Sequence, residues 1–352
     1  MKKIIITILL LVLSPLTLAS PEVVLEPVPD QGIQPVLERD AEGGIHLLYF
    51  SRVKEGSGYY LYRQRTDSGW SEAKRVNPEP VRASDVIGRA DMAVGMNGKV
   101  HVTYFSGDYF YSQLDPASNT FSRPRKVATK LLEGIEAGAA VSVQGQKVAV
   151  VWHAGNMRDE SSRQVVGVFS KDDGRSFGEA LAISDKSLGA CACCGMTSRY
   201  TAGGDLQVAY RTAIENTGRH MQLFMNGKTD QIGEWFIDAC PVSTNQFNGQ
   251  SLVFETEGRV YLHRMDNYTS VALAPDVESK RQKHPSVAEN DTGIRLIVWG
   301  DAPGYVAGGL LNAAAVLPDG SVAAINVPEV SIQDYGAAAV EWLTADQFLV
   351  LY

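Results

Sequence analysis

The sequence predicts an all-β protein, a β-propeller built from four-stranded antiparallel blades. Three observations lead to this prediction. A hairpin-like unit recurs seven times along the chain, further strand-like runs lie between its copies, and both chain ends carry strand-like segments that can join in one blade. Each unit has a short run of small and apolar residues, then a turn with Gly or Asp, then an alternating strand that usually ends in an aromatic residue.

The second strand of each unit shows the alternation of a half-buried strand. In the copy that begins at Ala90, Val100, Val102 and Tyr104 point to one side of the sheet, while His101 and Thr103 point to the other. The seven copies begin at Gln34, Ala90, Ala139, Met196, Gln250, Pro285 and Ala337.

The segments between the copies supply the remaining strands. The runs 58–69 and 70–76, and again 164–174 and 176–184, provide third and fourth strands of a blade. The last copy ends at Tyr352 after two strands, and the run EVVLEPVP from Glu22 is a spare strand that can complete that blade and close the ring. We therefore expect one domain over residues 20–352 with seven blades, or six if the short unit at Gln250 is irregular.

The first nineteen residues resemble a secretory leader. Lys2 and Lys3 precede an apolar run from Ile4 to Leu13, and Ala19 ends a small-residue cleavage pattern. This predicts an exported protein, periplasmic or secreted, with residues 1–19 as its signal peptide. No later run approaches the ~20 apolar residues of a membrane-spanning helix.

The charge excludes some partner classes. The whole chain carries 32 basic and 40 acidic residues, and removal of the leader takes away two lysines and no acid. An acidic protein without basic runs is a poor partner for nucleic acid or anionic membranes. A small ligand, a metal ion, a glycan or another protein remains as the expected partner.

The segment SKDDGRSF resembles the Asp box of sialidase-like (BNR) propellers, with Ser170, Asp172, Gly174 and Phe177 at its fixed positions. The resemblance implies a turn between the third and fourth strands of a blade, away from the substrate face. There the aspartate caps turn amides, the glycine takes a positive φ, and the aromatic ring packs between blades. We assign these four residues a structural role.

The catalytic machinery of the sialidases is not recognisable by motif. That family needs an arginine triad, a Tyr/Glu pair and an acidic residue, and its first arginine lies in a F/Y-R-I-P motif, whereas the matching region here reads GIQPVLERD. Weak catalytic candidates remain in loops that follow strands: Arg52, Asp159, Arg211 and Glu215.

The cysteines form the sharpest local pattern. Cys191, Cys193 and Cys194 lie within four positions, and Cys240 precedes a proline. This C-x-C-C and C-P pattern is similar to that of a subset of exported bacterial sialidase-like proteins of no assigned activity. The triplet and Cys240 occupy equivalent connections, from the fourth strand of one blade to the first strand of the next. We therefore expect all four thiols on one face, near the central axis.

Three readings of these cysteines stay open. In an oxidising compartment an even number of cysteines predicts disulfides. Cys240 is expected to pair with Cys193 or Cys194, because a bond between those neighbours is strained, and the other of the two bonds Cys191 or stays free. Alternatively, the thiolates bind a soft metal ion, copper first and zinc second, helped by Met157, Met196 or histidines. The third reading is a reactive thiol.

The same face receives other loops that can line a ligand site. Its candidates are His153, Arg211, His220, Trp299 and Asp301, although interblade packing is the simplest explanation of Trp299. We expect an exported binding protein with a cysteine-lined face and copper as its leading ligand. The alternatives are an exo-acting glycoside hydrolase on glycans and a platform for protein interactions.

Overall fold

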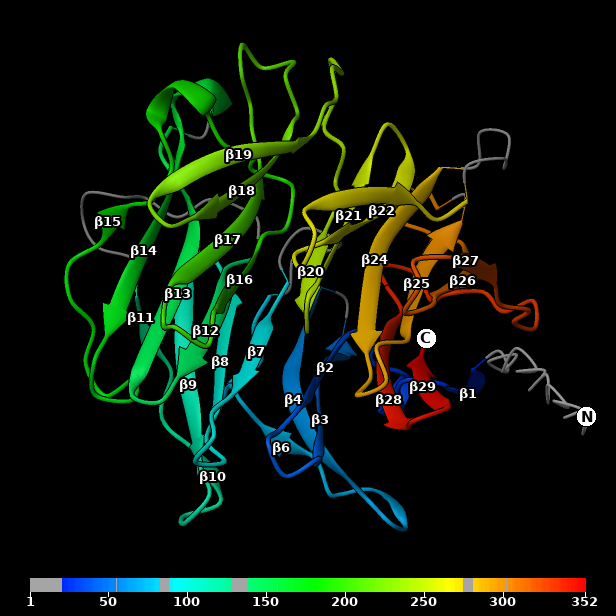
Figure 1. The fold of residues 1–352 in the computed structure, drawn as a ribbon. Helices are drawn as coiled ribbons and strands as arrows, with labels where there is room; N and C mark the ends of the chain where they lie inside the picture. The colour runs from blue at the N-terminus through cyan, green and yellow to red at the C-terminus, as the bar shows by residue number, and fades with distance from the viewer. Residues whose placement is uncertain are drawn as a thin grey trace, which may run out of the picture.

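Seven β-sheets follow one another along the chain and surround a common axis, in the order that the colours of Figure 1 show from blue to red. This computed structural model describes residues 21–54, 56–82, 89–127, 138–156, 158–274, 281–301, 303–304 and 306–352. The expected leader at residues 1–19 and Met157 lie outside the described residues. The seven sheets confirm the predicted seven-bladed propeller, and the six-bladed alternative is wrong.

Blades 1 to 3 each begin with the innermost strand and proceed outward by antiparallel hairpins. In blades 1 and 2 the outermost strand is divided into two short pieces that pair with the same third strand. Blade 1 consists of β2 (Ile33–Arg39), β3 (Ile45–Lys54), β4 (Ser57–Thr66), β5 (Gly69–Trp70) and β6 (Lys74–Arg75). Blade 2 consists of β7 (Asp91–Val94), β8 (Val100–Phe105), β9 (Tyr109–Asp115), β10 (Thr120–Phe121) and β11 (Arg125–Lys126). Blade 3 consists of β12 (Ala140–Gln144), β13 (Lys147–Ala154), β14 (Gln164–Ser170) and β15 (Leu181–Ala182).

Blades 4 to 6 repeat the four-stranded plan. Blade 4 consists of β16 (Thr197–Tyr200), β17 (Leu206–Arg211), β18 (Met221–Met225) and β19 (Lys228–Gly233). Blade 5 consists of β20 (Asn245–Asn248), β21 (Ser251–Thr256), β22 (Arg259–Arg264) and β23 (Thr269–Ala272). Blade 6 consists of β24 (Gln282–Glu289), β25 (Arg295–Asp301), β26 (Leu310–Val316) and β27 (Val322–Ala324). Single 3-10 turns lie at η1 (Pro29–Gln31), η2 (Glu160–Ser162) and η3 (Lys186–Leu188).

Blade 5 explains why the repeat at Gln250 looked short. The hairpin that we took for its first and second strands forms β21 and β22, the second and third strands of the blade. Its first strand, β20, has the sequence NQFN, which carries one large apolar residue and therefore lacks the apolar signature of the other inner strands.

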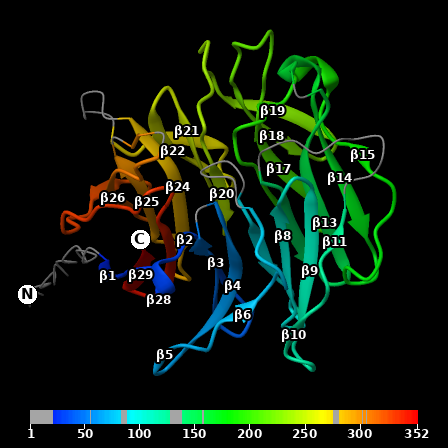
Figure 2. The ribbon, with the colours of Figure 1, turned by 180° about the vertical axis from the view of Figure 1, so that it is seen from behind.

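The seventh blade joins the two ends of the chain. It contains β28 (Ala339–Thr344), β29 (Gln347–Leu351) and β1 (Glu22–Glu26), and β1 lies beside β29 in both views of the molecule (Figures 1 and 2). The expected closure by the N-terminal strand is thus present, but this blade has three strands and β1 runs parallel to β29, with Glu22 opposite Gln347.

The core is divided among the interfaces between blades. Seven apolar clusters of buried residues fill the seven interfaces in the described part of the chain. Val100, Val102 and Tyr104 pack into the cluster between blades 1 and 2, as their alternation predicted. Each such side chain, when fully buried, stabilises the fold by about 1.5–3 kcal/mol relative to an exposed one.

The segment SKDDGRSF lies at the turn between β14 and β15, the third and fourth strands of blade 3. Asp172 Oδ1 accepts a hydrogen bond from the Ser176 amide at 2.9 Å, and Gly174 has a φ of 74°. The Phe177 ring packs edge-on against Tyr111 of blade 2, with 5.0 Å between ring centroids. These contacts match the structural role that the sequence predicted.

The inner strands β2, β7, β12, β16, β20, β24 and β28 surround a central cavity of about 530 Å³. Gly195 and Thr244, which lie in the connections that lead into β16 and β20, also line this cavity. The connections between blades therefore form part of the cavity wall, and one pair of them carries the cysteines. Within the described ranges, we find no helix with the length and apolar character that a membrane crossing requires.

Candidate functional site

The cysteine triplet lies in the connection between η3 and β16 and is held there by backbone hydrogen bonds. The Cys191 amide donates to the Arg211 carbonyl at 2.9 Å, and the Cys194 amide closes a turn onto the Cys191 carbonyl at 3.4 Å. Gly189 begins the segment at a φ of 59°, and a Cβ there would lie 2.9 Å from the Ala213 carbonyl oxygen. Only glycine fits this approach without a shift of the backbone.

The connection with Cys240 lies directly beside the triplet. A disulfide joins Cys193 to Cys240 with 6.6 Å between their Cα atoms, and the Gly195 amide donates to the Ser243 carbonyl at 2.9 Å. The expectation that ring closure brings these two connections together is confirmed. The pairing of Cys240 with one of the adjacent cysteines also agrees with the prediction.

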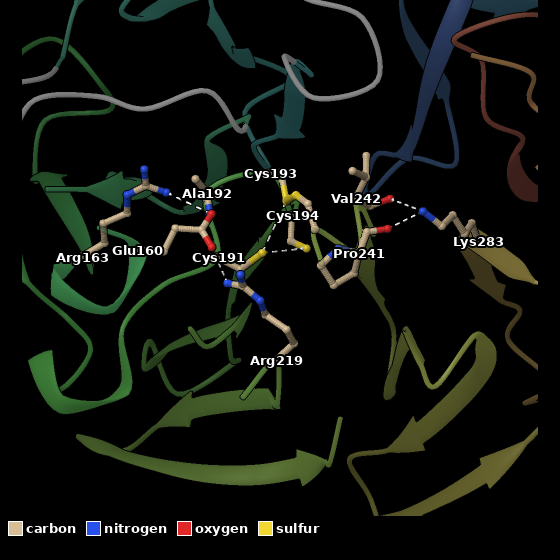
Figure 3. The surroundings of a disulfide bond; sticks show 11 residues. Glu160, Arg163, Cys191, Ala192, Cys193, Cys194, Arg219, Pro241, Val242 and Lys283 are labelled. Atoms are coloured by element: carbon tan, nitrogen blue, oxygen red, sulfur yellow. Dashed lines mark hydrogen bonds and ion pairs between the residues drawn. A yellow bond between two sulfur atoms is a disulfide. The ribbon is translucent and has the colours of Figure 1, made fainter. Parts of the chain in front are cut away.

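The remaining two cysteines are free and buried. Cys191 Sγ lies 3.2 Å from Cys194 Sγ and 3.5 Å from Cys193 Sγ, and the three sulfur atoms lie within 4.8 Å of one another (Figure 3). Val242 and Tyr335 pack against the sulfurs and form an eighth apolar cluster, separate from the interblade cores. The site is therefore a compact sulfur centre, which solvent reaches only at its edge.

Charged side chains surround the sulfur centre on the side of blades 3 and 4. Glu160 binds Arg219 at 2.5 Å and Arg163 at 3.3 Å, and its Oε1 atom accepts the Ala192 amide at 3.3 Å (Figure 3). Arg211 is 1 % exposed and donates to the carbonyl oxygens of Arg219 and Glu255. Glu160 thus ties the cysteine segment to two arginines.

A second pair of charges lies toward blades 5 and 6. Lys283 Nζ donates to the carbonyl oxygens of Pro241 and Val242, which anchors the Cys240 connection (Figure 3). Glu255 is fully buried, and within the described residues its carboxylate oxygens make no hydrogen bond of normal geometry. Desolvation raises the pKa of Glu255 to about 7, against the opposing charges of Lys283 and Arg211.

The surroundings shift the pKa values of the two free thiols in opposite directions. Desolvation works against ionisation of Cys194, but the Cys191 hydrogen bond, the Arg211 charge and the Ser243 backbone outweigh it and lower the Cys194 pKa. The same hydrogen bond, together with burial, raises the pKa of Cys191 well above its usual value. The pair therefore shares one proton, with the negative charge on Cys194.

The two candidate histidines are buried. His153 is fully buried at the end of β13, and desolvation lowers its pKa to about 3, so that its imidazole is neutral. His220 is 5 % exposed, accepts the Trp235 amide at Nδ1 and stacks edge-on against Phe236. No hydrogen bond joins either ring to a cysteine in the described part of the chain. Met196 packs between blades 3 and 4 and also lines the central cavity.

Trp299 and Asp301 lie within β25 and not in a loop at the mouth. Trp299 is 1 % exposed, packs in the core between blades 5 and 6, and donates its indole N–H to Asp301 Oδ1 at 2.8 Å. Asp301 Oδ2 accepts a hydrogen bond from Asn312. The structure thus corresponds to the packing alternative for Trp299, because the strand extends two residues beyond the aromatic position.

The weak catalytic candidates are dispersed. Asp159 caps η2 by accepting hydrogen bonds from the Ser161 amide and hydroxyl, and Glu215 is exposed in a turn with a φ of 48°. Arg52 is exposed and lies over the Tyr335 ring, 4.8 Å from its centroid. Of these four candidates, only Arg211 is among the charged residues described above around the sulfur centre.

Sequence reasoning singled out Glu160 only as a loop carboxylate, and it missed three other charged residues around the sulfur centre: Arg219, Glu255 and Lys283. A signal existed for two of them, because Glu255 interrupts the apolar run SLVFET of β21, and Lys283 lies in the buried strand β24. A charge inside a buried strand needs a partner, and this would have pointed to a polar centre nearby.

The possible ligand set for a metal ion consists of sulfur. Cys191 and Cys194 offer two free thiols, and Cys193 adds a third sulfur if its disulfide is reduced. Two buried thiolates close to arginines suit a soft cation that accepts few ligands, such as Cu(I). A tetrahedral Zn(II) site needs about four ligands, and the disulfide form offers two thiols.

Comparison with known proteins identifies the fold alone. No protein-family model matches the chain, and no curated protein matches it. Among solved structures, a protein of unknown function from Dyadobacter fermentans has a TM-score of 0.54 at 11 % identity, with 87 % of this chain and 98 % of that chain covered.

Two carbohydrate-active enzymes are similar to the same degree. The α-L-arabinanase of Penicillium chrysogenum, in complex with arabinobiose, has a TM-score of 0.53 at 10 % identity, covering 82 % of this chain and 94 % of that chain. The α-L-arabinofuranosidase of Fusarium graminearum has a TM-score of 0.53 at 12 % identity, covering 84 % and 93 %. These neighbours share the propeller architecture, which many unrelated activities use.

Proposed function

We propose that this chain is an exported binding protein whose sulfur centre binds a soft metal ion, with Cu(I) as the preferred ion and Zn(II) second. The observation that carries the proposal is the assembly of three sulfur atoms within 4.8 Å of one another, two of them free thiols, in a buried centre beside the central cavity. Soft thiolate ligands favour Cu(I) over harder cations.

Charge balance supports a two-thiolate site. Cu(I) bound by the thiolates of Cys191 and Cys194 carries one net negative charge. The neighbouring Arg211 and Arg219 supply positive charge, part of which Glu160 neutralises through its ion pair with Arg219. A buried negative complex needs such compensation.

The Cys193–Cys240 disulfide suits an oxidising compartment, which agrees with the export that the sequence of residues 1–19 predicts. Periplasmic or secreted placement, and the copper site itself, are parts of this proposal.

Competition for Cu(I) tests the proposal. Purified protein, without thiol reductant in solution, is titrated against a chromophoric Cu(I) chelator under anaerobic conditions. We expect one tightly held Cu(I) per chain, and we expect Cys191→Ser and Cys194→Ser each to lower the affinity by about tenfold or more, since a buried thiolate ligand is lost.

The matched control changes the two cysteines that are not these ligands. Cys193→Ser combined with Cys240→Ser removes the disulfide but leaves both free thiols, and we expect it to keep Cu(I) binding. The proposal is wrong if the wild-type protein does not compete with the chelator, or if the two single variants bind Cu(I) as the wild type does.

The glycoside hydrolase alternative has weaker support. Asp159 accepts hydrogen bonds as the cap of η2, and Glu215 is exposed in a turn. Among the described residues, no contact places these two carboxylates in one cleft. Fluorogenic sialosides and arabinosides test the alternative directly. Hydrolysis that Asp159→Asn abolishes would favour the enzyme.

A further inference from the structure

The Cys193–Cys240 disulfide has one exposed and one buried end. Cys240 is exposed to solvent, whereas Cys193 is 6 % exposed and its sulfur lies 3.5 Å from Cys191 Sγ. Cys191 in turn lies 3.2 Å from Cys194 Sγ, and both of these residues are at most 1 % exposed. The four sulfurs therefore form a chain of contacts from the surface to a buried dithiol.

We infer that these four cysteines form a thiol–disulfide relay, which carries two electrons between the buried Cys191/Cys194 dithiol and a low-molecular-weight disulfide in solution. The inference goes beyond metal binding and does not require it. It rests on the order of the sulfur contacts and on the exposure of Cys240.

The order of the contacts fixes the order of the steps. In the first step Cys191 passes its proton to the Cys194 thiolate, to which it donates a hydrogen bond. The resulting Cys191 thiolate attacks Cys193 Sγ, a Cys191–Cys193 bond forms, and the Cys193–Cys240 bond breaks to release the Cys240 thiolate. In the second step Cys194 releases that proton to solvent and its thiolate attacks Cys191 Sγ, so that a Cys191–Cys194 bond forms and the Cys193 thiolate is released. One disulfide is lost and one is gained, so that electrons and atoms balance within the chain.

The exposed thiolate then reacts with the co-reactant. Cys240 attacks a solution disulfide, forms a mixed disulfide with one half, and releases the other half as a thiolate. Cys193 attacks Cys240 Sγ, restores the Cys193–Cys240 bond, and releases the second thiolate. The net reaction oxidises the buried dithiol and reduces one external disulfide to two thiols.

The positions of the cysteines assign different roles to Cys191 and Cys194. Cys194 is adjacent to Cys193 in sequence, and a disulfide between neighbours is strained, so that direct attack by Cys194 on Cys193 is disfavoured. Cys191 is therefore the residue that exchanges with the disulfide. Cys194 resolves the intermediate, at the C-x-x-C spacing from Cys191.

The test uses metal-free protein with oxidised glutathione, followed by an acid quench, alkylation and mass spectrometry of non-reduced peptides. Wild-type protein is expected to consume one oxidised glutathione per chain and to end with both a Cys191–Cys194 and a Cys193–Cys240 disulfide. Cys194→Ser is expected to stop at a Cys191–Cys193 disulfide with glutathione attached to Cys240.

Cys191→Ser keeps the disulfide and the fold but removes the exchanging thiol. In this variant we expect oxidation of the remaining buried thiol to slow on the order of tenfold or more, because glutathione must reach it without the relay. Near-wild-type melting of the variant confirms that it is folded.

Two results overturn the relay: glutathione attached to Cys191 or Cys194 in the wild type before any reaches Cys240, or a Cys194→Ser protein without the Cys191–Cys193 bond. Because the protein is metal-free throughout, these outcomes are independent of the Cu(I) titration. Failure of the relay therefore leaves the metal proposal to its own test, and the converse holds as well.

Discussion

Removal of the Cys193–Cys240 disulfide should lower stability by an amount that its position in the chain sets. The bond joins residues 47 positions apart, in the connections that precede blades 4 and 5. For a loop of this length the chain-entropy relation gives about 4 kcal/mol of stabilisation at 25 °C, and measured losses for native disulfides are typically about 2–4 kcal/mol. We expect Cys193→Ser combined with Cys240→Ser to lose an amount in that range.

The loss converts to a modest shift in melting temperature because the chain is long. With an unfolding entropy of roughly 2.1 cal/mol/K per residue, a loss of about 2–4 kcal/mol corresponds to a decrease in Tm of about 3–5 °C. The assay is calorimetry or circular dichroism at one fixed scan rate, since proteins of this size often unfold irreversibly.

A phosphine reductant separates the disulfide from the effect of the serine substitutions. It should lower the Tm of the wild type toward that of the double variant and leave the variant unchanged. A variant that melts with the untreated wild type would refute the reasoning, and so would a reductant that lowers both proteins equally.

Three further predictions concern other parts of the fold. Desolvation raises the pKa of Glu341 to about 7; because the folded-state pKa lies above the unfolded one, stability falls as pH rises from about 4.5 to 7. Glu341→Gln should therefore be the more stable protein above pH 7 by on the order of 3 kcal/mol, with no gain below about pH 4.5, as denaturation at both pH values measures. Phe177→Ala removes a half-buried ring between blades 2 and 3 and should cost about 2 kcal/mol in denaturant unfolding without altering Cu(I) affinity; a loss below about 0.5 kcal/mol would contradict the packing role. Gly189→Ala should cost at least about 1 kcal/mol and weaken Cu(I) binding, because its Cβ meets the Ala213 carbonyl and displaces the cysteine segment; unchanged affinity in the chelator assay would show that the segment tolerates the shift.

The sequence predicted the propeller because the strand pattern recurs along the chain. Such a recurring pattern is visible in the sequence without knowledge of any tertiary contact. Alternation in 100–104 reports which side chains enter an interblade core, whatever the neighbouring blade is. Blade 5 was misread because β20 carries one large apolar residue, so that its strand signal is weak beside those of β21 and β22.

The sulfur centre was only half predictable. Topology alone places equivalent connections on one face, which is why Cys193 and Cys240 could be expected to meet. Which cysteine pairs, and which charges surround the free thiols, depends on side chains from several blades. Glu160 and Arg219 reach the centre from different connections, and no spacing in the chain encodes their 2.5 Å contact.

The seam between β1 and β29 has a consequence for biosynthesis. β1 pairs with β29, Glu26 opposite Leu351, so that the ring cannot close on a nascent chain before β29 has been synthesised. Until then β1 presents bare strand edges, the kind of surface that invites association with other chains. Products that terminate early, before residue 347, keep those edges permanently, and we expect them to be cleared or to aggregate while the full-length protein does not.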